Sequence, residues 1–479
     1  MVFNNISQDV LQKLRSTFFA TLAVVVAGIS APAARADTLA DALVSAYANS
    51  GLLVQNRALL RAADEDVAAA GAALEPVLRW TASITQNLDR GRNSALLGVQ
   101  NSDSLLASGS LIAELLLYDG GATALGIDVA KETVLATRQS LIGIEQQVLL
   151  RGVQAYMGVI EATEFVQLRQ NNVRVLTQEL RAAQNRFEVG EVTRTDVALA
   201  EAQLAEARSG LATAQGNLAI SVEEYRNIIG RSPGRLSPPP RLPSLDGNID
   251  AAKALAVRVH PDLRAVQYRV SAAELAIRRA EAAKRPTVAL QGALSMSDDF
   301  GSSNFSTGAR IGINAGGTIY QGGARSSLVR AAQARRDAER GNLHVVRNNI
   351  QQNVGNAYAQ LSSARASIVA SEQQIRAARI AFNGVREEAT LGARTTLDVL
   401  DAEQALLDAE AARISAQTLV YNAAYAVLAA TGRLTARDLR LPVQFYDVNE
   451  YYNLVKDSPT KRSEQGAQLD RVLKSLQKE

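Results

Sequence analysis

Residues 391–403 read Leu391-Gly392-Ala393-Arg394-Thr395-Thr396-Leu397-Asp398-Val399-Leu400-Asp401-Ala402-Glu403, and this stretch predicts a sharp turn between two helices. Gly392 ends the helical pattern before it, because glycine adopts the left-handed conformation at little cost. Thr395 or Thr396 can cap the helix that follows, whose first turns carry acidic residues where the helix dipole favours negative charge. Asp398 and Asp401 are three residues apart, so both carboxylates lie on one face of that helix.

The same construction occurs earlier in the chain. The segment Val189-Gly190-Glu191-Val192-Thr193-Arg194-Thr195-Asp196-Val197 aligns with the later turn at an offset of 202 residues, which is the separation of Gly190 and Gly392. The same offset relates pairs outside the turns: Tyr118 and Tyr320, Gly120 and Gly322, Tyr156 and Tyr358, Glu201 and Glu403, Gly230 and Gly432. One register kept over so long a stretch indicates a tandem duplication. We therefore predict two repeats, residues 37–250 and 251–440.

The N-terminus has the pattern of a secretory signal peptide over residues 1–36. Lys13 and Arg15 precede an apolar core, and Ala34-Arg35-Ala36 forms a cleavage site of the small-x-small type. The alternative is a membrane anchor, which needs about 20 apolar residues, more than this run supplies. We expect cleavage before Asp37.

The composition excludes several classes of protein. The chain has no cysteine, so it has no disulfide, thiolate metal site or cysteine nucleophile. A net charge of +3 spread over 479 residues gives no indication of nucleic-acid binding. His260 and His344, the two histidines, show no metal-ligand spacing with carboxylates, and no serine, carboxylate and histidine arrangement suggests catalysis. We predict no enzyme activity, no cofactor and no metal site.

Two stretches alternate apolar and polar residues, as strands with one apolar face do. Residues 77–117 and 287–319 are each predicted to form a β-hairpin, with turns near residues 89–103 and 298–306. Strands of roughly ten residues match a tilted membrane β-strand in length. Trp80, Phe300 and Phe305 lie near strand or turn ends, where an aromatic residue at a membrane interface would sit.

Long helices are predicted on either side of the two glycine turns. Residues 121–189 and 323–390 have uninterrupted helical patterns, and each helix would be about 100 Å long at 1.5 Å per residue. Such lengths predict a coiled coil or helical barrel rather than a globular core. Shorter helices match the long ones when laid end to end in pairs: residues 193–229 with 251–285, and 39–75 with 394–430. A proline-rich linker fills residues 231–250, and we expect the tail, residues 441–479, to be partly disordered.

Together these features resemble the TolC family of outer-membrane efflux and secretion ducts. The most specific match is the stretch 391–402, close to that family's second periplasmic turn, and Tyr-x-Gly-Gly at 118–121 and 320–323 and His260-Pro261-Asp262-Leu263 are further marks. The resemblance covers about residues 37–440. It implies a fold that is mainly α with a β-barrel portion, formed by a homotrimer. Three copies of four strands would make a 12-stranded outer-membrane β-barrel, continued by a long periplasmic α-helical barrel.

The resemblance also implies a function, location and partners. The protein would be the outer-membrane exit duct of a tripartite efflux or type I secretion system, seated in outer-membrane lipid with a periplasmic extension. It would pass small molecules or unfolded protein passively, with energy from an inner-membrane ABC or RND-type transporter. A periplasmic adaptor (membrane fusion) protein would dock at the turns near Gly190 and Gly392. The alternative is a non-channel periplasmic coiled-coil structural or adaptor protein, which would not need strands with apolar faces of lipid length.

Residues at the turns receive roles from the same resemblance. Asp398 and Asp401 match the paired aspartates that line the family's tunnel entrance, where three copies would form a cation-attracting constriction. Arg394 matches the arginine that links neighbouring coils in the closed state, and its expected partners are Thr195 and Asp196. Where relatives often carry a tyrosine that helps this latch, the chain has Ala389.

The same charged residues could have simpler roles. Asp398 and Asp401 could only stabilise the start of a helix, and Arg394 could be solvated. Asp401 aligns with Leu199 in the first repeat, so the second carboxylate exists in one repeat only, which favours the constriction. Glu403 and its repeat equivalent Glu201 are expected to be solvated or intersubunit charges on a helix face.

Overall fold

The structure is a computed structural model that describes residues 36–91, 100–245, 247–300, 305–460 and 463–476. The signal peptide predicted over residues 1–36 lies outside the described residues, apart from Ala36. The chain divides into two compact units, each assembled from separated parts of the sequence. The first unit comprises residues 1–49, 152–242 and 370–418, and the second comprises residues 50–151, 243–369 and 419–479.

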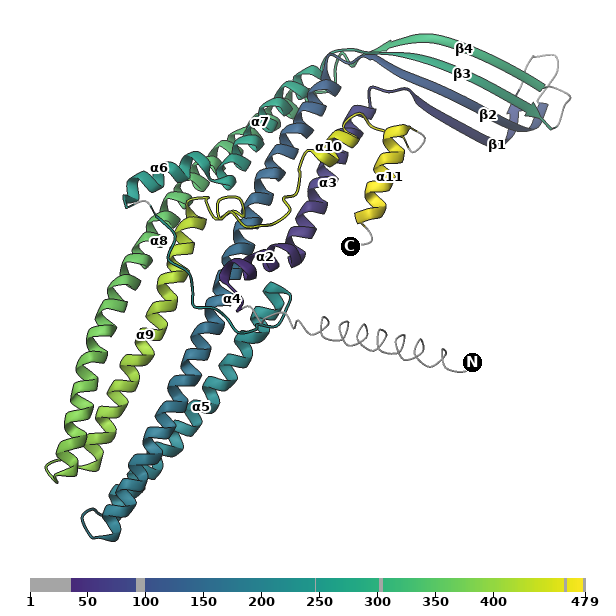
Figure 1. Cartoon of the computed structure of the whole chain (residues 1–479). Coiled ribbons are helices and arrows are strands. Elements are labelled where there is room, and N and C mark those ends of the chain that lie inside the picture. The colour runs from purple at the N-terminus through teal and green to yellow at the C-terminus, as the bar shows by residue number, and fades with distance from the viewer. Residues whose placement is uncertain (1–35, 92–99, 246, 301–304, 461–462, 477–479) are drawn as a thin grey trace, which may run out of the picture. The chain divides into compact units, whose positions relative to one another are not determined.

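The second unit contains a four-stranded antiparallel sheet in the order β1-β2-β3-β4 (Figure 1). Its strands are β1 Val77–Gly91, β2 Gln100–Tyr118, β3 Thr287–Asp299 and β4 Phe305–Gly316. The first hairpin has the predicted extent, but its strands reach further into the turn predicted over residues 89–103, because β1 continues through Gly91 and β2 already begins at Gln100. The order places β1 and β4 at the two edges of the sheet.

The strand register separates an apolar face from a polar one. Trp80 pairs with Leu111 and Leu111 pairs with Leu294, so large apolar side chains line up across three strands. On the opposite face, hydroxyl groups pair across the strands, with 2.6 Å between the oxygens of Thr81 and Ser110. Similar links join Ser83 to Ser108, Ser297 to Ser306 and Asn314 to Gln291. The predicted alternation therefore yields a two-faced sheet.

The helix predicted over residues 251–285 is two helices, α6 Ile249–Val259 and α7 Pro261–Ala282. Proline has no backbone N–H and restricts the residue before it to extended conformations. His260 accordingly has ψ 128°, and its Nδ1 accepts a hydrogen bond from the Asp262 backbone at 3.2 Å, which caps α7. The break between α6 and α7 is therefore the start of a new helix, which His260 caps.

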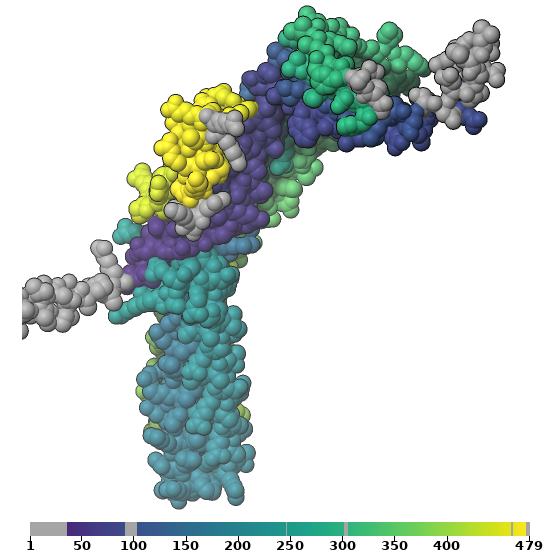
Figure 2. All heavy atoms as spheres, turned by 90° about the vertical axis from the view of Figure 1, so that its right-hand side faces the viewer, coloured from purple at the N-terminus to yellow at the C-terminus, as the bar shows by residue number. Residues whose placement is uncertain are grey.

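Helix α3, Gly51–Ala72, is covered by the C-terminal part of the chain. Figure 2 shows this segment in yellow against the purple of α3. It contains α10, Glu450–Val455, and α11, Glu464–Leu476, so part of the tail expected to lack order is helical. Leu469 and Leu473 are four residues apart and therefore share the face of α11 that packs toward Ala68 of α3.

The first unit contains the lower parts of two antiparallel helix pairs (Figure 1). One pair is α4 Ala122–Glu188 with α5 Arg194–Ile229, and the other is α8 Ala324–Thr390 with α9 Thr396–Ala430. Helices α4 and α8 have 67 residues each. The short helix α2, Leu39–Asn49, packs against α5. The fold is thus mainly helical with a four-stranded sheet, as the sequence predicts.

Candidate functional site

The ends of the two helix pairs share one turn geometry. Gly190 has φ 81° and Gly392 has φ 78°, a left-handed conformation that only glycine adopts without strain. The next helix then starts with a capping box. The Thr395 backbone N–H donates to Asp398 Oδ2 at 2.9 Å, and the Asp398 N–H donates to Thr395 Oγ1 at 3.2 Å. Thr193 and Asp196 form the same box at the start of α5.

Asp398 and Asp401 lie in the first turns of α9, and they differ in what they contact. Asp398 is partly exposed, and the hydrogen bonds from the Thr395 backbone and hydroxyl hold the pKa of its carboxyl below the ordinary value. It therefore carries its negative charge at neutral pH. Asp401 is exposed, and its carboxylate makes no hydrogen bond or ion pair within the described chain. The capping role foreseen for Asp398 is present, and the role of the pair in a constriction remains a prediction.

Arg394 contacts its own turn in this structure. Its Nε lies 2.9 Å from Glu388 Oε2, six residues earlier, and both side chains are about half exposed. Within one chain Arg394 is therefore paired with Glu388 rather than with its expected partners. Of those partners, Asp196 is bonded to Thr193, and Thr195 is exposed at the other turn. A link from Arg394 to Thr195 or Asp196 stays a prediction for contacts between copies.

Ala389, where relatives often have a tyrosine, is buried in an apolar cluster. The cluster joins Phe382 of α8 and Val399 of α9, with Val175 of α4 packed against it. Ala389 is 4% exposed, so this position faces other helices and not water. Near the second turn of this chain, apolar side chains therefore pack around Phe382.

Polar links between the two helix pairs were missed by the sequence reasoning. Glu403 was expected to be a solvated or intersubunit charge, but within one chain it is 7% exposed and its Oε1 accepts a hydrogen bond from Asn172 Nδ2 at 2.5 Å. Burial raises the pKa of Glu403, and the bond from Asn172 partly opposes that rise. The hydrogen bond from Asn172 reduces the free-energy cost of burying the Glu403 carboxylate in the interface. The sequence does not distinguish the buried Glu403 from its repeat equivalent Glu201, which is exposed, so the pair of Asn172 and Glu403 could not be predicted.

A second link joins α8 to α4. Arg386 Nε lies 3.1 Å from Glu179 Oε1, and the glutamate side chain is only 14% exposed. Further along, Ser415 Oγ donates to Glu161 Oε1 at 2.9 Å, which connects α9 to α4. These contacts hold the second helix pair against the first within this unit.

A groove of about 610 Å³ lies between α4, α8 and α9. Arg379 pairs with Glu410 at 2.7 Å and Arg413 approaches Glu164 at 3.8 Å, so much of the charge that lines the groove is neutralised within the chain. Among the described residues, no group of three histidine, aspartate or glutamate side chains could hold a metal ion. We therefore assign no ligand to this groove.

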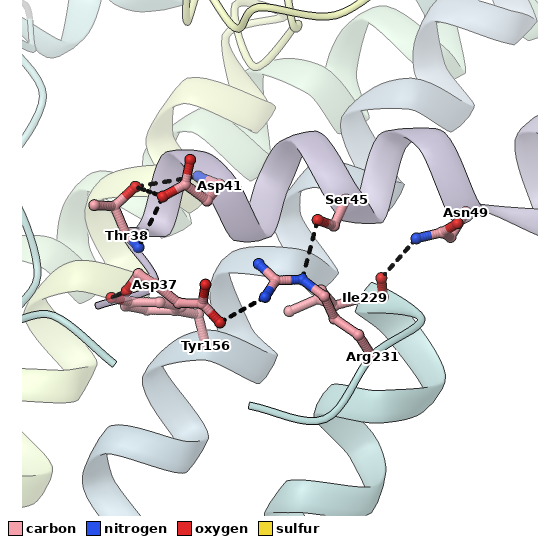
Figure 3. A network of polar contacts seen from close by, with 8 residues as sticks. All are labelled: Asp37, Thr38, Asp41, Ser45, Asn49, Tyr156, Ile229 and Arg231. Carbon is pink, nitrogen blue, oxygen red and sulfur yellow. Dashed lines mark hydrogen bonds and ion pairs between the residues drawn. The ribbon is translucent and has the colours of Figure 1, made fainter. Parts of the chain in front are cut away.

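A polar joint fixes the start of α2 to the end of α5 (Figure 3). Arg231 Nη1 lies 2.7 Å from Asp37 Oδ2, and its Nε donates to Ser45 Oγ at 3.3 Å. The Tyr156 hydroxyl lies close to two backbone carbonyls, those of Asp37 at 3.0 Å and Ser237 at 2.7 Å. Burial raises the pKa of Tyr156 to about 12, so the hydroxyl remains protonated and able to donate. The joint holds the linker and α2 on the long helix α4 and has no reactive group of its own.

No helix in the described part of the chain has both the length and the apolar character that crossing a membrane requires.

Comparison with known proteins identifies relatives over most of the chain. The sequence profile of the family described as "Outer membrane efflux protein" matches residues 42–231 and 254–433. The chain is 35% identical over 441 residues to the outer membrane efflux protein BepC of Brucella suis, covering 91% of this chain and 94% of the relative. It is 26% identical over 342 residues to the outer membrane protein TolC of Escherichia coli, covering 65% and 68%.

The fold also matches solved structures. The CmeC outer membrane channel of Campylobacter jejuni superposes with a TM-score of 0.72 at 16% identity, over 87% of this chain and 89% of that one.

Proposed function

Because the chain belongs to the outer membrane efflux protein family, we propose that it is the outer-membrane exit duct of a tripartite efflux or type I secretion system. It passes small molecules or unfolded protein from an inner-membrane transporter of the ABC or RND type to the outside. The duct does no chemistry, and transport through it is passive. The resemblance to the TolC family inferred from the turn motif and the repeats agrees with this family membership.

The open sheet is the observation that carries the proposal. In one copy, β1 and β4 are edge strands, and their backbone groups would be unsatisfied in lipid. Apolar side chains on these strands are largely exposed: Trp80 is 76% exposed, Ile84 73% and Ile311 78%. Such a sheet needs both lipid on its apolar face and further strands at its edges. A homotrimer supplies the strands, because β1 of one copy can pair with β4 of the next to close twelve strands into a barrel.

The polar face of the sheet supports a water-filled passage. Hydroxyl and amide side chains pair along it, including Thr81 with Ser110 and Asn314 with Gln291. When the apolar face points to lipid, the side chains of this face point into the barrel, because successive residues of a strand alternate between faces. The lumen is therefore lined by neutral polar groups together with charged ones, because Glu114 pairs with Gln291, and Arg79 and Arg310 lie on the same face of the sheet.

The helix-pair ends are the periplasmic end of the duct in this proposal. A periplasmic adaptor protein docks at the turns around Gly190 and Gly392, which are exposed. Asp398 and Asp401 of three copies form a constriction that attracts cations. Arg394 acts as a latch to Thr195 or Asp196 of a neighbouring coil when the end is closed, exchanging its partner Glu388 for them.

Conductance across a planar lipid bilayer tests the proposal. The purified mature protein should be a trimer in detergent and should produce stepwise ion currents after insertion. A control of the same protein unfolded before addition should produce none. A water-soluble monomer without conductance would contradict the duct and support a periplasmic coiled-coil structural or adaptor protein instead.

A further inference from the structure

The C-terminal strap, defined here as residues 441–460 and 463–476, lies along α3. Its aromatic side chains contact charged residues of the helices below. Tyr451 donates its hydroxyl to Glu65 Oε1 at 2.6 Å, and the Arg57 guanidinium lies 5.2 Å from the centre of the Tyr446 ring. Apolar packing of Tyr451, Leu454 and Val455 with Ala68, Leu469 and Leu473 completes the contact. These contacts between the strap and α3 all involve side chains, so breaking them does not itself break the backbone hydrogen bonds of α3.

Helix α4 contributes a second set of contacts to the strap. Arg138 Nη1 donates to Asn449 Oδ1 at 2.8 Å, and its guanidinium lies 5.2 Å from the centre of the Tyr452 ring. The Nε of Arg138 is buried and has no hydrogen-bond partner in the described chain. Arg138 therefore binds the strap but leaves part of its hydrogen-bonding capacity unused.

Asp64 of α3 lies beneath this contact and is fully buried, with 0% exposure. Neither of its carboxylate oxygens has a hydrogen-bond partner within the described residues. The charged and titratable groups that act on it come from every neighbouring element. Glu65 of α3, Arg138 of α4, and Tyr446 and Tyr451 of the strap interact electrostatically with Asp64. Arg61 of α3 acts on both tyrosines, and Glu450 of the strap acts on Tyr446.

A buried carboxylate without hydrogen bonds is costly when ionised and much less costly when protonated. Burial accordingly raises the pKa of Asp64 from 3.8 to about 6, with Arg138 opposing the rise and Glu65 adding to it. Ala68 lies one turn from Asp64 on the same face of α3 and packs against Tyr451 and Val455 of the strap, so detachment of the strap would expose the Asp64 carboxylate to water and lower its pKa toward the ordinary value. The strap and the proton on Asp64 therefore favour each other.

We propose that the C-terminal strap is a proton-dependent fastening, which binds α3 most tightly when Asp64 is protonated and loosens when Asp64 is ionised. The raised pKa belongs to the docked state, so the extra stability is fully present below pH 3.8 and is lost as the pH rises to about 6. Acid thus tightens the strap and near-neutral pH loosens it. The device acts on α3 and the chain terminus, and it does not depend on the proposed channel function.

Hydrogen exchange of the full mature protein in detergent, followed by mass spectrometry, tests the fastening. After correction for the pH dependence of intrinsic exchange, the opening equilibrium of α10 and α11 should rise about tenfold between about pH 5 and about pH 7.5. Peptides from α4 report in the same samples that the rest of the unit is intact. Equal protection of α10 and α11 at both pH values would overturn the proposal, and this comparison needs no variant.

Two variants identify the group responsible. Asp64→Asn is neutral at every pH, so its strap should show the same opening equilibrium at both pH values. Asp66→Asn removes a neighbouring acid that is exposed on α3, and it should keep the full pH dependence of the unmodified protein. If the Asp64→Asn protein retained that dependence, the titrating group would be another residue and the assignment to Asp64 would be wrong.

Discussion

At the scale of the residue, the two carboxylates that follow the second turn differ, because Asp398 is held by hydrogen bonds and Asp401 is not. Asp398 uses its Oδ2 to accept from both the backbone and the hydroxyl of Thr395. Its Oδ1 accepts no hydrogen bond within the described chain, and Asp401 lies one turn further along α9. Capping and a cation-attracting role are therefore compatible for Asp398, because they use different oxygens.

Replacing both carboxylates tests the constriction. Asp398→Ala with Asp401→Ala removes six charges from a trimer, so the ratio of cation to anion permeability should fall several-fold and block by divalent cations should weaken. Single-channel recordings in salt gradients measure both. Glu206→Ala, which removes an exposed acid from α5, is the control and should leave both properties as they are. Unchanged permeation in the double variant would reduce the pair to helix-start acids.

Arg394 and Glu388 allow the latch to be separated from the local ion pair. If Arg394 holds neighbouring coils together, Arg394→Ala should raise the open probability of the channel several-fold. Glu388→Gln breaks the same 2.9 Å ion pair but leaves the arginine free for Thr195 or Asp196, so it should not raise the open probability. Single-channel records of both variants decide between the roles. An equal increase in the two would assign the effect to the ion pair within the turn.

The turn shows how far residue-level reasoning reached. Glycine conformation, the threonine cap and the first-turn acid are local rules, and the structure follows them at both turns. The pairing of Arg394 with Glu388 was not foreseen, because competition between exposed partners depends on rotamers rather than on sequence spacing. The burial of Glu403 was not foreseen either, since it depends on which face of α9 meets α4.

At the scale of the element, the contact of the two helix pairs depends on a few polar bonds within an aliphatic interface. Leu176, Leu204, Ala207 and Leu400 form a buried cluster of α4, α5 and α9. Within the same unit, the Asn172–Glu403 bond links α4 to α9 and the Arg386–Glu179 pair links α4 to α8. Aliphatic contacts resist separation in any direction, whereas the buried hydrogen bond also specifies one register of α4 against α9.

The buried bond can be tested by removing each partner. Asn172→Ala leaves the Glu403 carboxylate buried without its donor, which should reduce local stability by about 1–3 kcal/mol. Glu403→Gln keeps a polar partner for Asn172 and removes the charge. Hydrogen exchange of α9 around residue 403 measures both effects. Faster exchange is expected for Asn172→Ala, and the same rate in Asn172→Ala as in the unmodified protein would show that the bond is not a support of this interface.

The pH dependence of the same exchange has a defined sign. Because burial raises the pKa of Glu403 above 4.5, its contribution to stability is fully present below pH 4.5 and decreases as the pH rises. Glu403→Gln removes this decrease, so at neutral pH its α9 should exchange no faster than that of the unmodified protein. Glu201→Gln, which changes the exposed repeat equivalent, should have no effect.

Element boundaries were predictable where local rules dominate. The long helical patterns correctly predicted α4 and α8, and the alternation of apolar and polar residues correctly predicted strands with one apolar face. Both periodicities reflect which side of a single element is buried. The helix expected over residues 251–285 is broken at Pro261, a signal that was present in the sequence but was outweighed by the continuous pattern. Helix α11 packs against α10 and the cluster of Ala68, Tyr451 and Val455, a contact that its polar composition does not reveal.

At the scale of the whole molecule, one chain has an incomplete sheet. Its edges β1 and β4 are separated by two strands, or about 14 Å at the usual spacing between neighbouring strands. The duplication accounts for the two hairpins of one chain, and the apolar faces of the strands suggested lipid. How many copies close the barrel is not encoded in any single strand, and the trimer was inferred through the family resemblance.

Cysteine cross-linking between the two edges of the sheet tests the trimer most directly. The chain has no cysteine, so Thr81→Cys on β1 can be combined in turn with Gly308→Cys, Arg310→Cys and Gly312→Cys on β4. These edges are too far apart for a disulfide within one copy, so any bond that forms must join two copies. Oxidised outer membranes should yield a covalent trimer at one or more of these registers, and each single-cysteine variant should stay monomeric on a non-reducing gel. Monomers at every register, from protein folded in the outer membrane, would contradict the shared barrel and with it the channel.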